Sequence, residues 1–536
     1  MTRRDYVTVN SCIMCQPMGS VLAFKGIENT MVLFHGSQGC STYMRLHLAH
    51  HFREPVDIAS SSLSEKGAVY GGRENLKKGL RNVINRYNPK IIGVATTCLA
   101  ETIGDDVPAI IREFKEEEGI GDSLEKDILI IPVSTPSYGE SHVTGYIKAV
   151  DAIIKAVDAA VRKTREEQEG SEIQEGSEKA GIFEKTENSG RTELSEALSE
   201  NPGAMGFMGN IEIMEYAELL KNEKLKRNLR EAKSQYTGKT VNNKLNLIPV
   251  ESLSPADIRE LKEILEATVG EYILLPDISE TFDAPLRSDL PKIAPGGTTL
   301  AEIADMPNSL ASLGLGTVSK NLAVDYLQKY HGVPSYNVPI PIGLSNTDRF
   351  FMEMARMGYS FPEKYQKERG RLLDAMVDVH KYLYGVKAGI YGDPDTVFSL
   401  TRFLLELGIN PVLVATGSKS RDFKQQVQKA FAEIRSDLKA IIMDNLDFDS
   451  FYDAVKQSNP ELLIGNSNGR YIAKAQGIPL VRVGLPVHDR IGAQRLLMVG
   501  YRGAMELLDR ITNTVLEATD TFTAPVQPDP EVICRS

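Results

Sequence analysis

The sequence predicts an α/β protein with three Rossmann-like domains, in which parallel sheets are flanked by helices. The chain has 536 residues, of which 42% are hydrophobic, enough for several cores at about 100–200 residues per domain. Short apolar runs rich in β-branched residues alternate with longer amphipathic stretches, a pattern typical of βαβ units. The short runs are apolar on both faces, as expected of strands in parallel sheets that helices cover on both sides.

The first domain is predicted over residues 1–161. Strands are expected at residues 91–95 and 128–133, where isoleucine and valine dominate short apolar runs. Cys98 follows the first of these strands directly. Because functional loops of parallel α/β sheets lie beyond the carboxyl ends of the strands, this cysteine stands where a functional residue is expected.

Residues 162–244 are predicted to interrupt the α/β pattern. From about residue 162 to residue 201 the chain is strongly charged, repeats a Glu-Gly-Ser-Glu element and has almost no large apolar residue. Such a segment buries too little apolar surface to fold, so we expect a disordered or loosely helical insertion. The basic run at residues 221–230 is interpreted as a solvated helix face.

Two further α/β domains are predicted over residues 245–385 and 386–518, followed by a C-terminal tail at residues 519–536. The second domain begins with a strand at 245–250, then a helix with Ser254 as its cap and Pro255 at its first position. Serine is a preferred N-cap, and proline fits the first helical turn. A similar succession of strand, helix and strand restarts at residue 386.

The composition excludes several classes of function. The formal net charge is −11, so we expect no binding to nucleic acid or to an anionic membrane. The first residues lack the apolar core of a signal peptide, and no apolar stretch reaches the roughly 18 residues of a membrane span. We therefore expect a cytoplasmic protein. Neither dinucleotide nor P-loop glycine motifs occur intact at a strand-to-helix junction, so this chain is expected to bind no ATP.

Three of the five cysteines mark a candidate metal site. Cys15, Cys40 and Cys98 each lie in a tight turn at the edge of an apolar run. Iron–sulfur clusters are held mainly by cysteine thiolates and usually need four, so these three predict half of a cluster site whose other ligands come from elsewhere. Their spacing is too wide for a zinc ribbon or a ferredoxin motif. The alternative is that each is a buried small hydrophobic residue.

Glycines near these cysteines favour the metal interpretation. Gly19, Gly36 and Gly39 are expected to let the backbone approach a bulky ligand or adopt a positive φ. His35 belongs to the same loop as Cys40 and is expected to order it.

The remaining cysteines and a histidine cluster are given other interpretations. Cys12 offers a fourth thiolate, a redox pair with Cys15 or a packing residue, and Cys534 is interpreted as an exposed bystander in the tail. His47, His50 and His51 are spaced as on one helix, and such clusters more often form a packed or solvated face than a metal site.

The motifs resemble those of the β-type nitrogenase component 1 family. The resemblance covers nearly the whole chain outside residues 162–244. It rests on motifs at residues 15–19, 35–40, 51–55, 96–98, 101–106, 135–137, 296–298, 369–374, 392–395, 465–467 and 500–503.

The resemblance implies a fold, a metal site and partners. In nitrogenase β subunits, three motif cysteines and the serine of a Thr-Pro-Ser motif contribute to an [8Fe-7S] P-cluster shared with the α subunit. These ligands match Cys15, Cys40, Cys98 and Ser137 here. The resemblance also implies the nitrogenase component 1 fold and an α2β2 heterotetramer with an α-like homologous subunit. That subunit would hold the molybdenum cofactor or its precursor. The resemblance further implies transient contact with an ATP-dependent iron-protein reductase.

Two branches of the family differ in function. The NifN-type scaffold is a non-catalytic subunit of the complex that assembles the iron–molybdenum cofactor. In it a simpler [4Fe-4S] cluster lies at this interface, and a cysteine that matches Cys40 is one of the ligands. The motifs at residues 20–28, 40–43, 54–60 and 93–99 are similar to those of scaffold sequences, and we expect a scaffold. The alternative is a nitrogenase β subunit that relays electrons for dinitrogen reduction. The presence of Cys15 and Cys98 keeps this alternative open.

Overall fold

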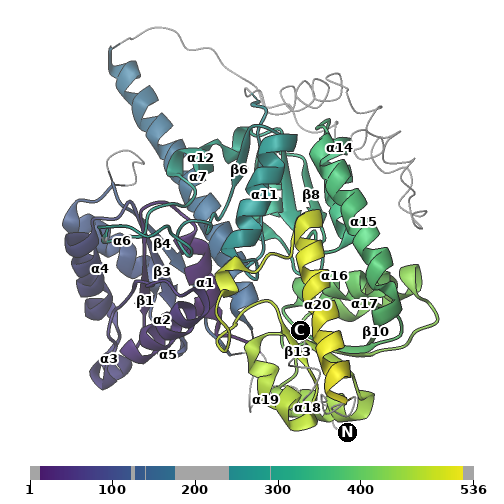
Figure 1. Cartoon of the computed structure of the whole chain (residues 1–536). Helices are drawn as coiled ribbons and strands as arrows, with labels where there is room; N and C mark the ends of the chain where they lie inside the picture. Colours follow the sequence, from purple (N-terminus) through teal and green to yellow (C-terminus); the bar gives the residue numbers. More distant parts are fainter. Residues whose placement is uncertain (1–12, 122–126, 139, 176–240, 290, 523–536) are drawn as a thin grey trace.

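The computed structural model describes residues 13–121, 127–138, 140–175, 241–289 and 291–522. Within these ranges the chain forms three parallel sheets, each flanked by helices (Figure 1). The predicted α/β fold class is confirmed. Most of the expected insertion, residues 176–240, lies outside the described ranges, as do Cys12 and Cys534.

The first sheet has four strands in the order β2-β1-β3-β4. Their bounds are β1 (Thr30–His35), β2 (Ile58–Ser60), β3 (Ile91–Thr96) and β4 (Leu129–Val133). The strands predicted at 91–95 and 128–133 correspond to β3 and β4. The chain passes from β1 outward to β2 and returns to β3 on the other side of β1, so the topological switch point lies between β1 and β3.

Helices cover both faces of this first sheet. Their bounds are α1 (Gln16–Lys25), α2 (Gln38–Phe52), α3 (Glu65–Tyr70), α4 (Arg73–Tyr87), α5 (Cys98–Ile103), α6 (Val107–Glu118) and α7 (His142–Glu175). Apolar residues of α4 and α6 share a core with Met31 and Leu33 of β1. The alternate residues Val32 and Phe34 belong to the core that includes α1 and α7, as the two-residue repeat of a strand requires. Helix α7 continues beyond the boundary expected at residue 161.

The second sheet repeats this topology with the strand order β6-β5-β7-β8. Its strands are β5 (Leu245–Ile248), β6 (Tyr272–Leu274), β7 (Ala311–Leu315) and β8 (Ser335–Val338), and its helical segments are α11 (Pro255–Thr268), α12 (Leu300–Asp305), η1 (Met306–Asn308), α13 (Leu322–His331), α14 (Leu344–Arg356) and α15 (Glu363–Leu383). Helix α11 begins as predicted, because Ser254 and Asp257 form a capping box and Pro255 occupies the first turn.

The third sheet has five strands in the order β11-β10-β9-β12-β13. Its strands are β9 (Lys387–Gly392), β10 (Asn410–Thr416), β11 (Ile441–Met443), β12 (Leu462–Gly465) and β13 (Leu480–Arg482). Its helical segments are α16 (Pro394–Glu406), α17 (Phe423–Ile434), α18 (Phe448–Ser458), η2 (Ser467–Gly469), α19 (Arg470–Gln476), η3 (Ala493–Arg495) and α20 (Gly500–Phe522). The switch point of this sheet lies between β9 and β12.

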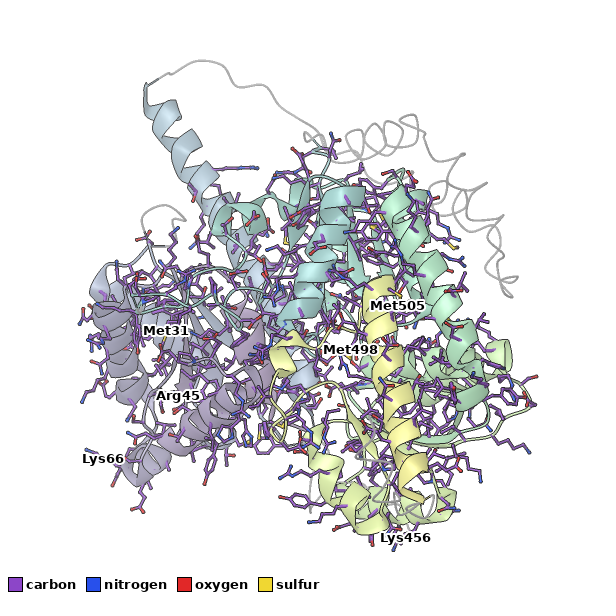
Figure 2. All side chains as sticks on the ribbon, viewed as in Figure 1. Met31, Arg45, Lys66, Lys456, Met498 and Met505 are labelled. Atoms are coloured by element: carbon purple, nitrogen blue, oxygen red, sulfur yellow. The ribbon has the colours of Figure 1, made fainter. Side chains whose placement is uncertain are left out.

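One continuous hydrophobic core connects the three sheets. It includes Phe34 of β1, Leu247 of β5 and Ile390 of β9. Helix α20 runs along α15 and so returns the C-terminal part of the chain to the second sheet (Figure 1). Met498, just before α20, is buried near the centre of the molecule (Figure 2). In the described part of the chain, no helix combines the length and apolarity needed to cross a bilayer.

Candidate metal centre

Cys40 and Cys98 lie at the switch point of the first sheet. Cys40 is in the first turn of α2, which follows β1, and Cys98 begins α5, which follows β3. Both cysteines are partly exposed. The crevice beyond the carboxyl ends of strands at such a point is the usual ligand site of open parallel sheets, so the fold brings two predicted ligands to one place.

A close backbone approach holds these two loops together. A Cβ atom at Gly36, the residue after β1, would lie 2.0 Å from Thr97 Oγ1. The Thr97 N–H donates a hydrogen bond to the His35 carbonyl oxygen over 3.1 Å. Only glycine at position 36 leaves room for this contact. Gly39, by contrast, has open space around it, so the structure gives no steric reason for a glycine there.

The turn that carries Cys15 is fixed by a tight helix crossing. Cys15 is the N-cap residue of α1 and is exposed. A Cβ at Gly19 would lie 1.8 Å from the His142 carbonyl oxygen, and one at Gly145 would lie 1.9 Å from the Gln16 carbonyl oxygen. Gly19 therefore serves helix packing rather than contact with a ligand, which corrects the expectation from the sequence. This crossing places Cys15 beside the chain that leaves β4.

Ser137 links the Cys15 turn to Cys98. Its hydroxyl oxygen accepts the Gln16 N–H over 2.9 Å, and its own N–H donates to Cys98 Sγ over 3.3 Å. The Cys15 residue as a whole is exposed, but its thiol group is largely surrounded by other atoms. This burial raises the pKa of the Cys15 thiol. The Ser137 hydrogen bond opposes this pKa shift, and the Cys98 and Cys40 thiols add to it. The three thiols and Ser137 thus form one cluster of side chains.

His35 orders the loop before Cys40 from inside the protein. The ring is fully buried, with Nδ1 lying 3.0 Å from Ser61 Oγ and Nε2 lying 3.0 Å from Asp105 Oδ2. The Ser61 hydroxyl also accepts the Gly36 N–H over 3.0 Å. Burial lowers the pKa of His35 despite the nearby Asp105 carboxylate. A neutral His35 therefore holds the Gly36 turn through Ser61, which agrees with the role expected of it.

The histidines of α2 form a packed face. His51 is buried, and its Nδ1 accepts the Val487 N–H over 2.9 Å. Burial lowers the pKa of His51 to about 3, so this ring is neutral near pH 7. The His47 ring stacks on His488 with 5.1 Å between ring centroids. These contacts join α2 to the segment after β13, and His50 also lies against His488.

The sequence motifs include Gln16, Thr96 and Glu101, but no role was predicted for these polar residues. Glu101 accepts hydrogen bonds from the Thr96 and Ser134 hydroxyls, which ties the start of α5 to the ends of β3 and β4. Gln16 is fully buried, and its amide donates to Glu140 over 2.6 Å. Glu101 and Ser134 are far apart in the sequence, as are Gln16 and Glu140, so only the fold shows that they are neighbours.

The donors present fit part of an iron–sulfur centre. Three thiols and one hydroxyl converge, one backbone N–H points at a sulfur, and such N–H donors stabilise thiolates and tune cluster potentials. A cluster held by four or more thiolates would be completed from outside this set. Because Cys15 is exposed, a second protein chain can reach the centre.

Comparisons with known proteins identify the family. Residues 15–516 match the family described as nitrogenase component 1 type oxidoreductase. The nitrogenase molybdenum-iron protein beta chain of Methanococcus maripaludis is 37% identical over 517 residues, which cover 95% of this chain and 94% of that protein. The beta chain of Clostridium pasteurianum is 33% identical, with 96% of this chain and 95% of that protein covered.

A solved structure agrees with these relatives. "Nitrogenase Cp1 at pH 6.5" superposes with a TM-score of 0.77 at 32% sequence identity, over 98% of this chain and 97% of that chain. A second chain, from "Nitrogenase Cp1 at pH 5", superposes with a TM-score of 0.62 at 14% identity and shares the fold alone. This chain therefore belongs to the nitrogenase component 1 family, as a β-type member.

Proposed function

We propose that this chain is the β subunit of a nitrogenase molybdenum–iron protein and holds its half of an iron–sulfur cluster at the contact with an α-like partner. The observation that carries the proposal is the convergence of Cys15, Cys40, Cys98 and Ser137 on one accessible site. The similarity to nitrogenase molybdenum-iron protein beta chains over nearly the whole chain supports it.

In this role the three cysteines supply thiolates and Ser137 supplies a hydroxyl oxygen, while the partner supplies the remaining ligands. The shared cluster, an [8Fe-7S] P-cluster in this proposal, provides one-electron transfer when bound. The Ser137 N–H donates to Cys98 Sγ, and a hydrogen bond to a ligating sulfur would help to set the potential of a bound cluster. The glycine contacts at Gly19 and Gly36 keep the thiols at fixed relative positions.

The proposal includes an α2β2 assembly in the cytoplasm and transient contact with an ATP-dependent iron-protein reductase. The chain lacks an intact P-loop, so ATP is used by the reductase in this scheme. In this scheme Cys15, Cys40 and Cys98 would hold this chain's part of a cluster on the electron path to a molybdenum cofactor in the partner.

The second candidate is the scaffold subunit for assembly of the iron–molybdenum cofactor. The scaffold-like motifs near Cys40 and before Cys98 favour it, and it would share a [4Fe-4S] cluster with its partner. We place it second because the relatives reported above are nitrogenase beta chains.

Acetylene reduction separates the two functions. The chain is co-purified anaerobically with its natural partner and supplied with reductase and ATP, and ethylene is measured. Sustained turnover is the expected result. If a brown, iron-containing complex gives only trace ethylene but donates cofactor to an apo-nitrogenase, the chain is the scaffold subunit and the first proposal is wrong.

A further inference from the structure

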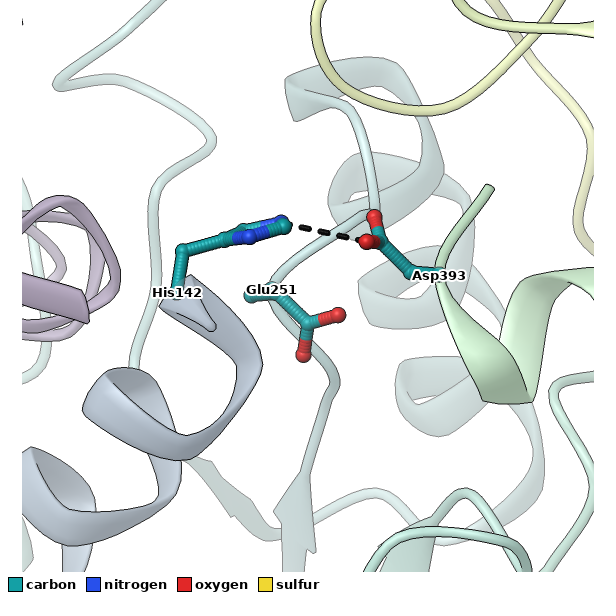
Figure 3. A group of neighbouring side chains, drawn as sticks. All are labelled: His142, Glu251 and Asp393. Atoms are coloured by element: carbon teal, nitrogen blue, oxygen red, sulfur yellow. Dashed lines mark ion pairs between the residues drawn. The ribbon is translucent and has the colours of Figure 1, made fainter. Parts of the chain in front are cut away.

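Three buried polar side chains meet where the three sheets come together (Figure 3). His142 is the first residue of α7, Glu251 follows β5, and Asp393 lies between β9 and α16. Their exposed fractions are 1%, 7% and 7%. Each therefore comes from the part of the chain that contains a different sheet, and all three are shielded from solvent.

The donor atoms of this triad have the spacing of metal ligands. His142 Nε2 lies 3.2 Å from Asp393 Oδ1, and one donor atom from each residue lies within 4.8 Å of the other two. Ligands at about 2.1 Å from a tetrahedral zinc ion lie about 3.4 Å from each other. The His142–Asp393 pair already matches that separation, and the Glu251 carboxylate lies beside it (Figure 3).

The triad is also short of hydrogen bonds. Both ring nitrogens of His142 are buried, and neither has a hydrogen bond of normal geometry. Asp393 is an N-cap residue, yet its carboxylate makes no capping hydrogen bond to the first turn of α16; it faces His142 instead (Figure 3). Because buried polar atoms are almost always satisfied, the His142 ring is the member of the triad that could take a further partner.

A second buried histidine–aspartate pair in the same chain shows the contrast. His331 Nε2 lies 3.1 Å from Asp158 Oδ2. The same carboxylate also accepts hydrogen bonds from the Tyr326 hydroxyl over 2.7 Å and from Arg162 over 2.6 Å. The protein itself therefore satisfies the Asp158 carboxylate, whereas the Asp393 carboxylate faces the His142 ring.

The charges of the triad suit a divalent cation. Burial, with repulsion from Asp393, raises the pKa of Glu251. Burial disfavours the charged ring of His142, but the Asp393 and Glu251 carboxylates outweigh it and raise the pKa of His142. Two carboxylates and one imidazole are buried together here. A cation of charge +2 would balance the two carboxylates, with the imidazole as the third ligand.

The surroundings would keep such a site rigid and leave space for one water. The Ser141 and Ser418 hydroxyls are 2.9 Å apart, and the Ser252 and Thr396 hydroxyls are 2.6 Å apart, so neighbours of all three triad residues are hydrogen-bonded across sheets. A cavity of about 20 Å³, which Glu251 lines but His142 and Asp393 do not, has room for a single water.

We propose that His142, Glu251 and Asp393 bind one divalent transition-metal ion, with Zn²⁺ as the representative ion, and that this ion joins the three sheets. Imidazole and carboxylate ligands are typical of zinc sites. The site shares no side chain with the thiol centre and does not depend on the proposed function.

The test uses the complete complex with its iron–sulfur cluster in place, so that the thiols are occupied. The complex is treated with a chelator, supplied with Zn²⁺ and freed of excess ion. We expect one bound zinc per chain, and His142→Gln to weaken zinc binding at least about tenfold. The matched control, His331→Gln, changes the other buried histidine–aspartate pair and should bind zinc as the wild type does.

Calorimetry supplies a second readout. Zinc binding by the wild type near pH 7 should give a measurable binding heat, because imidazole and carboxylate groups ligate Zn²⁺ directly. Glu251→Gln lacks one of the two carboxylates and should lose most of this heat together with most of the affinity. If His142→Gln fails to fold, Glu251→Gln takes its place in the measurement of zinc binding.

Diffraction decides the location. Crystals of the zinc-treated wild type should show an anomalous peak at the zinc absorption edge between the three side chains. No peak there, or equal zinc binding by the wild type, His142→Gln and Glu251→Gln, would show that the triad is a metal-free cluster that balances its charges with protons, and would overturn the proposal.

Discussion

The thiol centre and the buried triad use the same feature of parallel sheets in opposite environments. Cys40 and Cys98 follow the central strands β1 and β3 of the first sheet, and Glu251 and Asp393 follow the central strands β5 and β9 of the other two. Loops beyond the carboxyl ends of central strands collect side chains that are distant in sequence. Thus one topology, repeated three times, builds two candidate sites for metals.

The environments decide what each site can do. Cys15 is an exposed residue, and Cys40 and Cys98 are partly exposed, so their ligand set can be completed by another protein. The triad is enclosed, with exposed fractions of 7% or less, so any ion there must be satisfied by this chain and by water. An open site with soft sulfur donors suits electron transfer between subunits, and a closed site with nitrogen and oxygen donors suits a structural ion.

The largest expected effect is loss of the thiol centre. Cys98→Ala removes a ligand at the switch point and the acceptor of the Ser137 N–H, so iron bound by the complex should fall at least about tenfold. Iron analysis and the visible spectrum check this. Cys534→Ala, in the C-terminal tail, is the control for cysteine loss. Normal iron in Cys98→Ala would remove this residue from the proposed ligand set.

A buried carboxylate that the protein satisfies sharpens the contrast with the triad. Asp257 is fully buried and accepts the N–H groups of Ser254 and Met498 over 3.0 and 2.7 Å. Burial outweighs these bonds and raises the pKa of Asp257 to about 6. Because the folded pKa exceeds the unfolded one, its contribution to stability is complete below about pH 4 and is lost as pH rises through 6.

Asp257→Asn should remove this pH dependence. Between pH 4 and 7, the local opening free energy of α11 in the wild type should fall by about 2 kcal/mol relative to the variant. Native-state hydrogen exchange measures this difference. Parallel pH profiles for the two proteins would contradict the assignment.

The helix crossing that positions Cys15 gives the next effect. Gly19→Ala forces a Cβ against the His142 carbonyl oxygen, which should cost about 1–3 kcal/mol of unfolding free energy and lower the iron content. Gly370→Ala in α15 meets no atom within 4 Å and should instead stabilise by about 0.5–1 kcal/mol. Denaturant unfolding compares the two; a stable Gly19→Ala protein would mean that the crossing is not tight.

The smallest effect is expected at Ser137. Ser137→Ala loses the hydroxyl that accepts the Gln16 N–H but keeps the backbone donor to Cys98. We expect a loss of about 1 kcal/mol in stability and a changed reduction potential, with most iron retained by the three cysteines. Redox titration followed by electron paramagnetic resonance detects the change. An unchanged potential would exclude Ser137 from the cluster environment.

The sequence predicted the regular elements well because their signals are local. The apolar run at 91–95 and the Ser254 cap each depend on neighbouring residues, and both appear in the structure as β3 and the start of α11. Gly19 was given the wrong role, because the steric conflict that requires a glycine there comes from α7, more than a hundred residues away.

The two candidate sites differed in how visible they were in the sequence. Only five cysteines occur in the chain, so three in turn motifs attract attention, whereas Glu251 and Asp393 are two among 72 acidic residues. His142 is an ordinary residue five positions after Ser137. The triad exists only through the meeting of three sheets, and no local pattern indicates that meeting.

The most direct test of the account is anomalous diffraction at the iron absorption edge from anaerobic crystals of the complex with its α-like partner. The account predicts iron bonded to the sulfur atoms of Cys15, Cys40 and Cys98 and to residues of the partner. Iron confined to the partner, with these three sulfurs free, would contradict the claim that this chain holds half of a shared cluster.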